Sequence, residues 1–193
     1  MLPRFDAICG ITTEDLDTIF APSVKDFAEA NNVTVEEAKS QLKQRYDGYH
    51  FSEGMTDIYN PFSLLNTFKF QKAKDYWFAS GTPTYLMRLL SHSDENIQDI
   101  IDHSYEAQEF VDYRATVEAP VPMIYQSGYL TIKGYDERFG IYRLGFPNKE
   151  VEDGFIQYLM PFYVPVKKEE SAFFIAYFVE DVEKGRPEEF MKR

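Results

Sequence analysis

The sequence has little cysteine, few cationic side chains and no long apolar run, and each shortage excludes a class of protein. A single cysteine, Cys9, cannot form an internal disulfide. We expect it to act as a small hydrophobic residue in the core. No apolar segment approaches the roughly 20 residues of a membrane helix, and the first residues lack the basic and apolar regions of a secretory signal. We therefore expect a cytoplasmic protein with no membrane partner.

The charge balance is acidic, with 20 Lys and Arg against 32 Asp and Glu and a net charge of −12. Proteins that bind nucleic acid usually gather Lys and Arg on one face, because bound phosphates must be neutralised. Nucleic acid is therefore a possible partner only through a local basic patch, and the overall charge does not support it.

Motifs that carry chemistry are also missing from the sequence. No Gly-rich loop ends in Gly-Lys-Ser or Gly-Lys-Thr, the pattern that cradles phosphates. Cys9 and the three histidines have no partners at metal-ligand spacing. Glu37-Ala38-Lys39 has the Glu-x-Lys spacing of a PD-(D/E)XK nuclease, but we expect it on a helix, where the side chains fan around the axis. We therefore predict no catalytic residue, metal site or cofactor site in this chain.

Aromatic and other apolar residues are plentiful instead. The 193 residues include 17 Phe and 14 Tyr, and 44% are hydrophobic. A chain of this length and composition can bury a core without disulfides or metals, so we expect an ordered globular fold.

Capping signals predict helices in the first part of the chain. Thr12 or Thr13 is expected to cap a helix that carries Leu16, Ile19 and Phe20. Thr34 and Glu37 form a capping box, in which each side chain satisfies the other residue's free backbone donor. That helix should end near Tyr46, before Gly48.

Further helix starts follow as far as residue 118. Asn60-Pro61 combines a capping residue with a proline at the first helical position, and Leu64, Leu65 and Phe68 follow at helical spacing. Similar starts lie at Thr82-Pro83 and at Asp94, and residues 75–78 read either as a short strand or as a helix end. We predict a helical, lid-like region over residues 1–118.

The segment 119–165 has a different pattern. Residues 123–126 read as helix, residues 129–132 and 141–144 as two strands of a hairpin, and Asn148 as the cap of a helix that carries Val151 and Phe155. This order predicts a winged-helix-like segment. Pro161 and Pro165 should break the chain, and residues 166–193 read as linker helices. The predicted fold is mainly α with a small β-hairpin (α+β).

Two sets of residues are candidates for function. Arg45, Asp47, Tyr49 and His50 form a polar and aromatic group that reads either as a satisfied turn around His50 or as a face toward a neighbouring domain or ligand. A winged helix that bound DNA would use the hairpin cations Lys133, Arg138 and Arg143. The nearby Asp136 and Glu137 offset their charge, and the preceding helix has no Lys or Arg.

Several longer motifs resemble one bacterial family of AAA-ATPase-like proteins. They are YDGYHF at 46–51, YNPFSLL at 59–65, SGTPTYL at 80–86, YQSGYL at 125–130 and LGFPNKEV at 144–151. The resemblance covers residues 7–163, in order and at similar spacing. Members of the family carry an N-terminal P-loop ATPase-like domain and a C-terminal PD-(D/E)XK nuclease-like domain.

The resemblance implies that this chain is the lid and winged-helix-like part of such a protein. The Walker A segment would then precede Met1, the metal-binding strands would follow Arg193, and ATP and Mg²⁺ would bind elsewhere in the longer protein. The partners would be these two domains of the same protein. No catalytic role is carried over to a residue of this chain.

Three hypotheses follow from the sequence. The first is a non-catalytic structural or regulatory module that relays the state of a nucleotide domain to a nuclease-like domain. The second is a winged-helix nucleic-acid-binding module, which a contiguous positive face would favour. The third is a hydrolase, which would require converging carboxylates or a paired histidine in a deep pocket.

Overall fold

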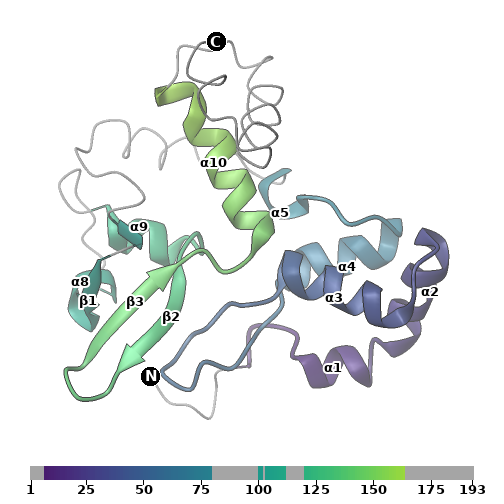
Figure 1. The fold of residues 1–193 in the computed structure, drawn as a ribbon, viewed down its shortest axis with the longest axis horizontal. Coiled ribbons are helices and arrows are strands. Elements are labelled where there is room, and N and C mark those ends of the chain that lie inside the picture. Colours follow the sequence, from purple (N-terminus) through teal and green to yellow (C-terminus); the bar gives the residue numbers. More distant parts are fainter. Residues whose placement is uncertain (1–6, 80–99, 102, 112–119, 164–193) are drawn as a thin grey trace, which may run out of the picture. The chain divides into compact units, whose positions relative to one another are not determined.

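The computed structural model describes residues 7–79, 100–101, 103–111 and 120–163 (Figure 1). The chain forms two compact units, Met1–Glu152 and Asp153–Arg193. The fold is mainly α with a small antiparallel sheet, as the sequence predicts. In the described residues no helix is both long and apolar enough to cross a membrane.

Five helices occupy the described part of the first 79 residues. They are α1 (Thr13–Asp17), α2 (Ala21–Asn31), α3 (Val35–Tyr46), α4 (Pro61–Phe70) and α5 (Tyr76–Ala79). The inner faces of α1 to α4 share a core that includes Leu16, Val24, Phe27, Leu42 and Leu64, each at most 1% exposed. Burial of side chains of this size contributes about 1.5–3 kcal/mol each, so this core is the main source of stability here.

Local hydrogen bonds set the helix starts at the predicted residues. Thr12 and Thr34 each form a capping box, with Asp15 and Glu37 respectively. The Asn60 side chain accepts hydrogen bonds from the Phe62 and Ser63 backbones at the start of α4. Because each cap satisfies donors that the helix leaves free, it stabilises the start by about 1 kcal/mol.

The sheet contains three antiparallel strands in the order β1-β3-β2. They are β1 (Ser104–Glu106), β2 (Thr131–Asp136) and β3 (Ile141–Gly145). Two short helices, α8 (Ala107–Val111) and α9 (Val121–Gln126), lie between β1 and β2 in sequence, and α10 (Lys149–Tyr163) follows β3. The predicted hairpin and the Asn148 cap of α10 are confirmed, the cap by a 3.2 Å hydrogen bond from the Val151 N–H. The strand β1 was not predicted.

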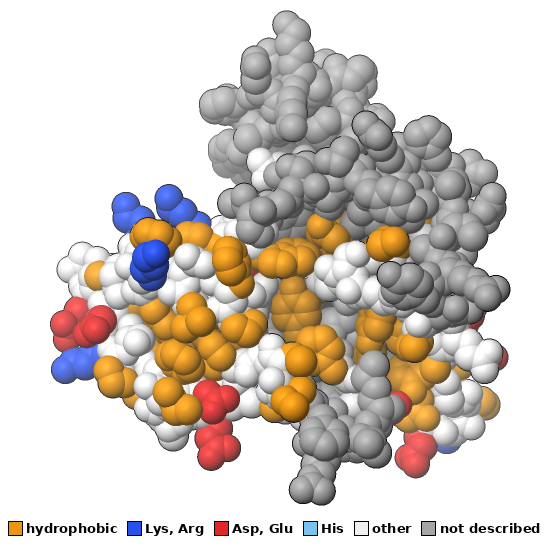
Figure 2. Space-filling model, turned by 180° about the vertical axis from the view of Figure 1, so that it is seen from behind, with side chains coloured by type: hydrophobic (Ala, Val, Ile, Leu, Met, Phe, Trp, Pro, Cys, Tyr) orange, Lys and Arg blue, Asp and Glu red, His pale blue; other side chains and the backbone are white. Residues whose placement is uncertain are grey.

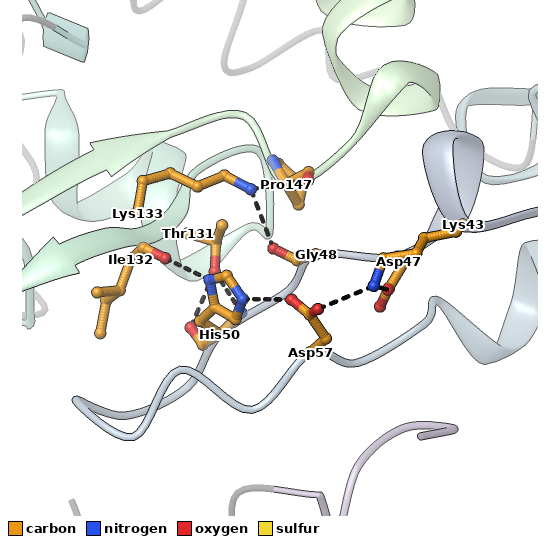
Figure 3. Close-up of polar contacts among 9 residues, drawn as sticks. All are labelled: Lys43, Asp47, Gly48, His50, Asp57, Thr131, Ile132, Lys133 and Pro147. Atoms are coloured by element: carbon orange, nitrogen blue, oxygen red, sulfur yellow. Dashed lines mark hydrogen bonds and ion pairs between the residues drawn. The ribbon is translucent and has the colours of Figure 1, made fainter. Parts of the chain in front are cut away.

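The long loop between α3 and α4 closes on itself. Tyr49 and Ile58 exchange backbone hydrogen bonds of 3.2 Å, and the Tyr59 N–H donates to the Ile11 carbonyl at 2.8 Å. Both bridges fix the loop ends, and the chain between them runs beside the β2–β3 hairpin (Figures 1 and 3). The loop therefore connects the helical core to the sheet.

Helix α4 exposes three large apolar side chains. Phe62, Leu65 and Phe70 are 47%, 48% and 53% exposed, and the Lys69 ammonium lies over the Phe70 ring. Helix α4 lies behind α3 in Figure 1, and the reversed view in Figure 2 shows hydrophobic side chains gathered over this part of the surface. Exposed apolar surface of this kind often marks an interaction site.

Three local predictions were wrong. Cys9 is exposed, because it lies in the turn that precedes the first core residue, Ile11. Ile19 and Phe20 are not carried by the first helix, because α1 ends at Asp17 and α2 begins at Ala21. Pro161 does not break the chain, because α10 continues to Tyr163.

Several predictions fall outside the described residues. The helix expected after Thr82-Pro83, most of the helix expected after Asp94, Pro165 and the linker helices over 166–193 are among them. The domain limits at residues 118 and 165 stay predictions. Strand β1 lies before residue 119 in the sequence but pairs with β3 through Ser104, Tyr105 and Glu106. The sheet therefore includes residues from both sides of the predicted limit.

A buried polar cluster as the candidate functional site

Charged and polar side chains gather where the α3–α4 loop meets the β2–β3 hairpin (Figure 3). We call this group the polar cluster. It comprises Lys43, Asp47, Gly48, His50 and Asp57 from the helical side and Thr131, Ile132, Lys133 and Pro147 from the sheet side. It connects parts of the chain that lie more than 80 residues apart in sequence.

His50 lies at the centre of the polar cluster and is 6% exposed. Its Nδ1 lies 2.7 Å from the Ile132 carbonyl oxygen, and its Nε2 lies 2.7 Å from Asp57 Oδ1. A carbonyl can only accept, so Nδ1 donates to it, and a carboxylate also requires a donor from Nε2. Both ring nitrogens are therefore engaged inside the fold.

Asp57 supplies the negative charge beside this ring. Burial raises the pKa of Asp57, but hydrogen bonds from His50 and Lys43 outweigh burial and hold the pKa below its usual value. Lys43 Nζ lies 3.3 Å from Asp57 Oδ2. The carboxylate therefore stays ionised near neutral pH and joins helix α3 to the histidine.

The Thr131 hydroxyl makes two hydrogen bonds to the backbone of His50. It accepts from the His50 N–H at 2.7 Å and donates to the His50 carbonyl at 2.8 Å. Thr131 is 2% exposed, so no bulk water competes for these groups. This pair of bonds holds the first residue of β2 against the loop.

The Lys133 ammonium also forms hydrogen bonds within the fold. Its Nζ donates to the Pro147 carbonyl at 2.9 Å and to the Gly48 carbonyl at 3.2 Å. Burial lowers the pKa of Lys133, and the nearby charges of Asp57 and Asp47 partly oppose that change. Lys133 thus connects the hairpin, the loop and the segment before α10.

The Asp47 carboxylate has the fewest compensating contacts of the charged groups in the polar cluster. Its side chain is 2% exposed, and Lys43 Nζ lies 3.6 Å from Oδ2. Among the described residues neither carboxylate oxygen accepts a hydrogen bond of good geometry, and the Gly48 N–H and Lys43 compensate its charge only weakly. Burial raises the pKa of Asp47, with the Gly48 backbone and Lys43 opposing it and Asp57 adding to it. A buried charge with so little compensation costs stability.

We predict that Asp47→Asn changes how stability depends on pH. The folded-state pKa of Asp47 is raised, so the folded protein holds this proton more tightly than the unfolded chain. Stability is therefore lost as pH rises from the unfolded pKa to the folded pKa, and the cost is complete above that window. The free energy of unfolding of the Asn variant relative to wild type should increase between pH 4 and pH 7, by about 1 kcal/mol.

Urea unfolding at both pH values measures this difference. Asp26→Asn, at an exposed carboxylate of α2, is the matched control and should show a smaller change. A relative free energy for Asp47→Asn that is constant with pH, or that falls, would contradict the buried, poorly compensated charge.

The first set of predicted site residues does not form one exposed face. Arg45 is 30% exposed at its side chain and pairs with Asp75 at 2.6 Å. Asp47, Tyr49 and His50 are 3%, 8% and 6% exposed. The arrangement corresponds to the satisfied turn around His50 and not to a surface that these four residues present to a neighbouring domain. Burial raises the pKa of Tyr49, so its hydroxyl stays neutral.

The three hairpin cations are used in different ways. Lys133 is internal. Arg138 is exposed and bonds to Asp136, with Nη2 2.9 Å from Oδ2. Arg143 is exposed on β3, where its guanidinium lies over the Gly134 backbone and a Cβ on that glycine would be 2.7 Å from Nη2. They do not form a contiguous basic patch.

The sequence reasoning missed Lys43, Asp57 and Thr131. Asp57 lies seven residues from His50, and Thr131 lies 81 residues from it, so no local spacing links them. The predicted Glu-x-Lys pair is used in local contacts. Glu37 accepts a hydrogen bond from the Thr34 N–H, as the capping box predicts, and Lys39 forms an ion pair with Asp17 at 2.6 Å. The Glu-x-Lys spacing therefore lies on a solvated helix face.

The polar cluster is suited to holding two parts of the fold together. No group of three or more potential metal ligands comes together in the residues that the structure describes. Most charged groups of the polar cluster bond to backbone carbonyls or to one another, so few are directed at a ligand.

A search of curated proteins finds a protein of Azotobacter chroococcum mcd 1, described as an uncharacterised protein in the vnfD 5′ region. The two sequences are 31% identical over 168 residues, which is 84% of this chain and 30% of that protein. The chain thus spans about a third of the length of its relative. No family model matches the chain, and no solved structure matches it.

Proposed function

We propose that this chain is a non-catalytic structural and regulatory module of a larger AAA-ATPase-like protein. In this proposal it couples a P-loop nucleotide domain to a PD-(D/E)XK nuclease-like domain, both on the same polypeptide. ATP and Mg²⁺ would bind to the nucleotide domain, and the chain itself would not be an enzyme. A bacterial, cytoplasmic location belongs to the same proposal.

The observation that carries this proposal is the way in which the polar cluster uses its charges. The loop is joined to the hairpin by hydrogen bonds of His50, Asp57 and Lys133. The shortest bond of each residue measures 2.7 to 2.9 Å. A charged network of this kind can stabilise one relative arrangement of two structural elements over other arrangements. Such a junction is suited to transmitting a movement of the helical region to the hairpin.

Two further observations support a place within a larger protein. The relative is more than three times as long as the matched region, which covers 30% of it. The large apolar side chains that α4 exposes, Phe62, Leu65 and Phe70, are of the kind that another domain covers.

The test uses the longer protein that the reading frame encodes. Lys133→Met removes the two hydrogen bonds to backbone carbonyls and keeps the aliphatic stem, while Arg138→Met on the exposed turn is the matched control. We expect wild type and Arg138→Met to cleave DNA in a nucleotide-dependent way. Lys133→Met should still hydrolyse ATP but lose most of that dependence. Circular dichroism checks that both variants are folded.

Three results would reject the proposal. One is ATP hydrolysis by the isolated chain, and another is a reading frame with no P-loop. The third is a nucleotide dependence that Lys133→Met leaves unchanged.

The second candidate is a winged-helix nucleic-acid-binding module. The order β1, α8, α9, β2, β3 and the pairing of β1 with β3 support it, because two short helices followed by a hairpin is the order expected for such a module. The charge opposes it: α9 has the sequence VPMIYQ, and Lys133 is bonded internally. We expect no saturable binding of a fluorescent DNA duplex in an anisotropy titration at low salt. Binding that Arg138→Ala and Arg143→Ala together abolish would establish the second candidate.

A further inference from the structure

A pocket of about 500 Å³ adjoins the polar cluster, with which it shares Ile132, whose backbone carbonyl belongs to the cluster. Its walls include the side chains of Phe51, Phe110, Tyr125 and Tyr142, with Glu53 and Val111 also lining it. Phe51 and Val111 are 37% and 49% exposed, whereas Phe110 and Tyr142 are 2% and 8% exposed. The pocket therefore has an open mouth and an aromatic interior, and its volume suits a whole small molecule.

The rings in this pocket are fixed in place. Phe110 packs against Tyr125 with ring centroids 4.8 Å apart at 74°, and against Tyr142 at 5.2 Å and 69°. Phe51 stacks on the buried Tyr49 at 6.3 Å and 13°. These ring contacts hold the aromatic lining in place, and the face of each ring is the negative side of its quadrupole.

The charge in the pocket is also negative. Glu53 lies at the mouth, where its Oε1 accepts a hydrogen bond of 2.6 Å from the Tyr142 hydroxyl. That bond lowers the pKa of Glu53, so the carboxylate is ionised at neutral pH. A carboxylate has room for about four donors, so it can still bind a ligand N–H or cation. Among the described lining residues there is no Lys, Arg or His.

We propose that this pocket binds a small organic cation, an alkylammonium or quaternary ammonium group attached to an apolar body. Aromatic faces attract such a cation, Glu53 supplies the opposite charge at the mouth, and the remaining volume takes the apolar part. The net charge of −12 favours the approach of cations to the chain. This inference does not depend on the proposed coupling role.

The experiment is calorimetric titration of the isolated chain with three probes. They are benzyltrimethylammonium, choline, and the uncharged isostere of choline in which a tert-butyl group replaces the trimethylammonium group. We expect benzyltrimethylammonium to bind most tightly and choline to bind at least about fivefold more tightly than its isostere.

Variants at the mouth of the pocket locate the site. Glu53→Gln should weaken benzyltrimethylammonium binding about fivefold. Phe51→Leu should weaken it about two- to threefold. Phe139→Leu removes a 69% exposed aromatic ring outside the pocket and should leave binding unchanged. Both mouth residues are exposed, so the variants are expected to fold, and circular dichroism verifies this.

Equal affinity for choline and its isostere would overturn the proposal, since the pocket would then select only apolar groups. So would no heat of binding from any ammonium probe at millimolar concentration, or an equal loss of binding in Phe139→Leu and Phe51→Leu.

Discussion

Gly48→Ala is expected to destabilise the protein by about 3 kcal/mol or more. Gly48 has φ of +100°, which L side chains rarely adopt, and a Cβ there would lie 2.4 Å from the Pro147 carbonyl oxygen. The clash is with backbone, so no side chain can rotate away to relieve it. The change would also push apart the two carbonyls, of Gly48 and Pro147, that Lys133 joins.

Gly140→Ala is the matched control for this substitution. Gly140 also has a positive φ, +65°, but a Cβ there would meet nothing within 4 Å. It should therefore lose only the backbone preference, about 1–2 kcal/mol. Free energies of unfolding in urea compare the two variants. If their losses are equal, the close approach of Gly48 to Pro147 does not exist in solution.

Thr131→Val is expected to cost about 2–4 kcal/mol. Valine has nearly the same shape as threonine, but it removes the hydroxyl that bonds to both the N–H and the carbonyl of His50. Thr131 is 2% exposed and His50 is 6% exposed, so these backbone groups would be left without bulk water as a replacement. A buried donor or acceptor without a partner costs more than the hydrogen bond contributed.

Thr131→Ser separates the hydroxyl from the methyl group. It keeps the two hydrogen bonds and should cost about 1 kcal/mol for the lost methyl. Amide hydrogen exchange gives a second measurement, because the His50 N–H should exchange faster in Thr131→Val than in Thr131→Ser. Similar stabilities and similar exchange rates for the two variants would show that the hydroxyl does not hold the loop.

Taken together, these two substitutions test whether the polar cluster is a structural junction. Gly48 and Thr131 contact the cluster from opposite sides, the loop and the hairpin. The proposed coupling function requires that junction. The pocket with Glu53 and its aromatic walls is a separate feature, since its ligand contacts would involve neither Gly48 nor Thr131.

Much of the local structure could be predicted, and the candidate site could be predicted only in part. His50 and Asp47 were identified as members of one polar group and Lys133 as a hairpin cation, but their partners were not predicted. The hairpin was predicted from its turn and β-rich residues. Strand β1 also alternates between exposed and buried residues, but it is only three residues long, which is too short to predict a strand. The burial of Lys133 was also missed, because a lysine on a hairpin is usually solvated.

The sequence by itself determined the helix starts and turns. Thr34 with Glu37, Asn60 and Asn148 act on backbone groups at most three residues away, so their effect depends only on near neighbours. The tertiary structure decided the rest. The bonds from Thr131 to His50 and from Lys133 to Gly48 span 81 and 85 residues. Such contacts depend on how the helices and the sheet pack, and that packing is a property of the whole core that no short motif contains.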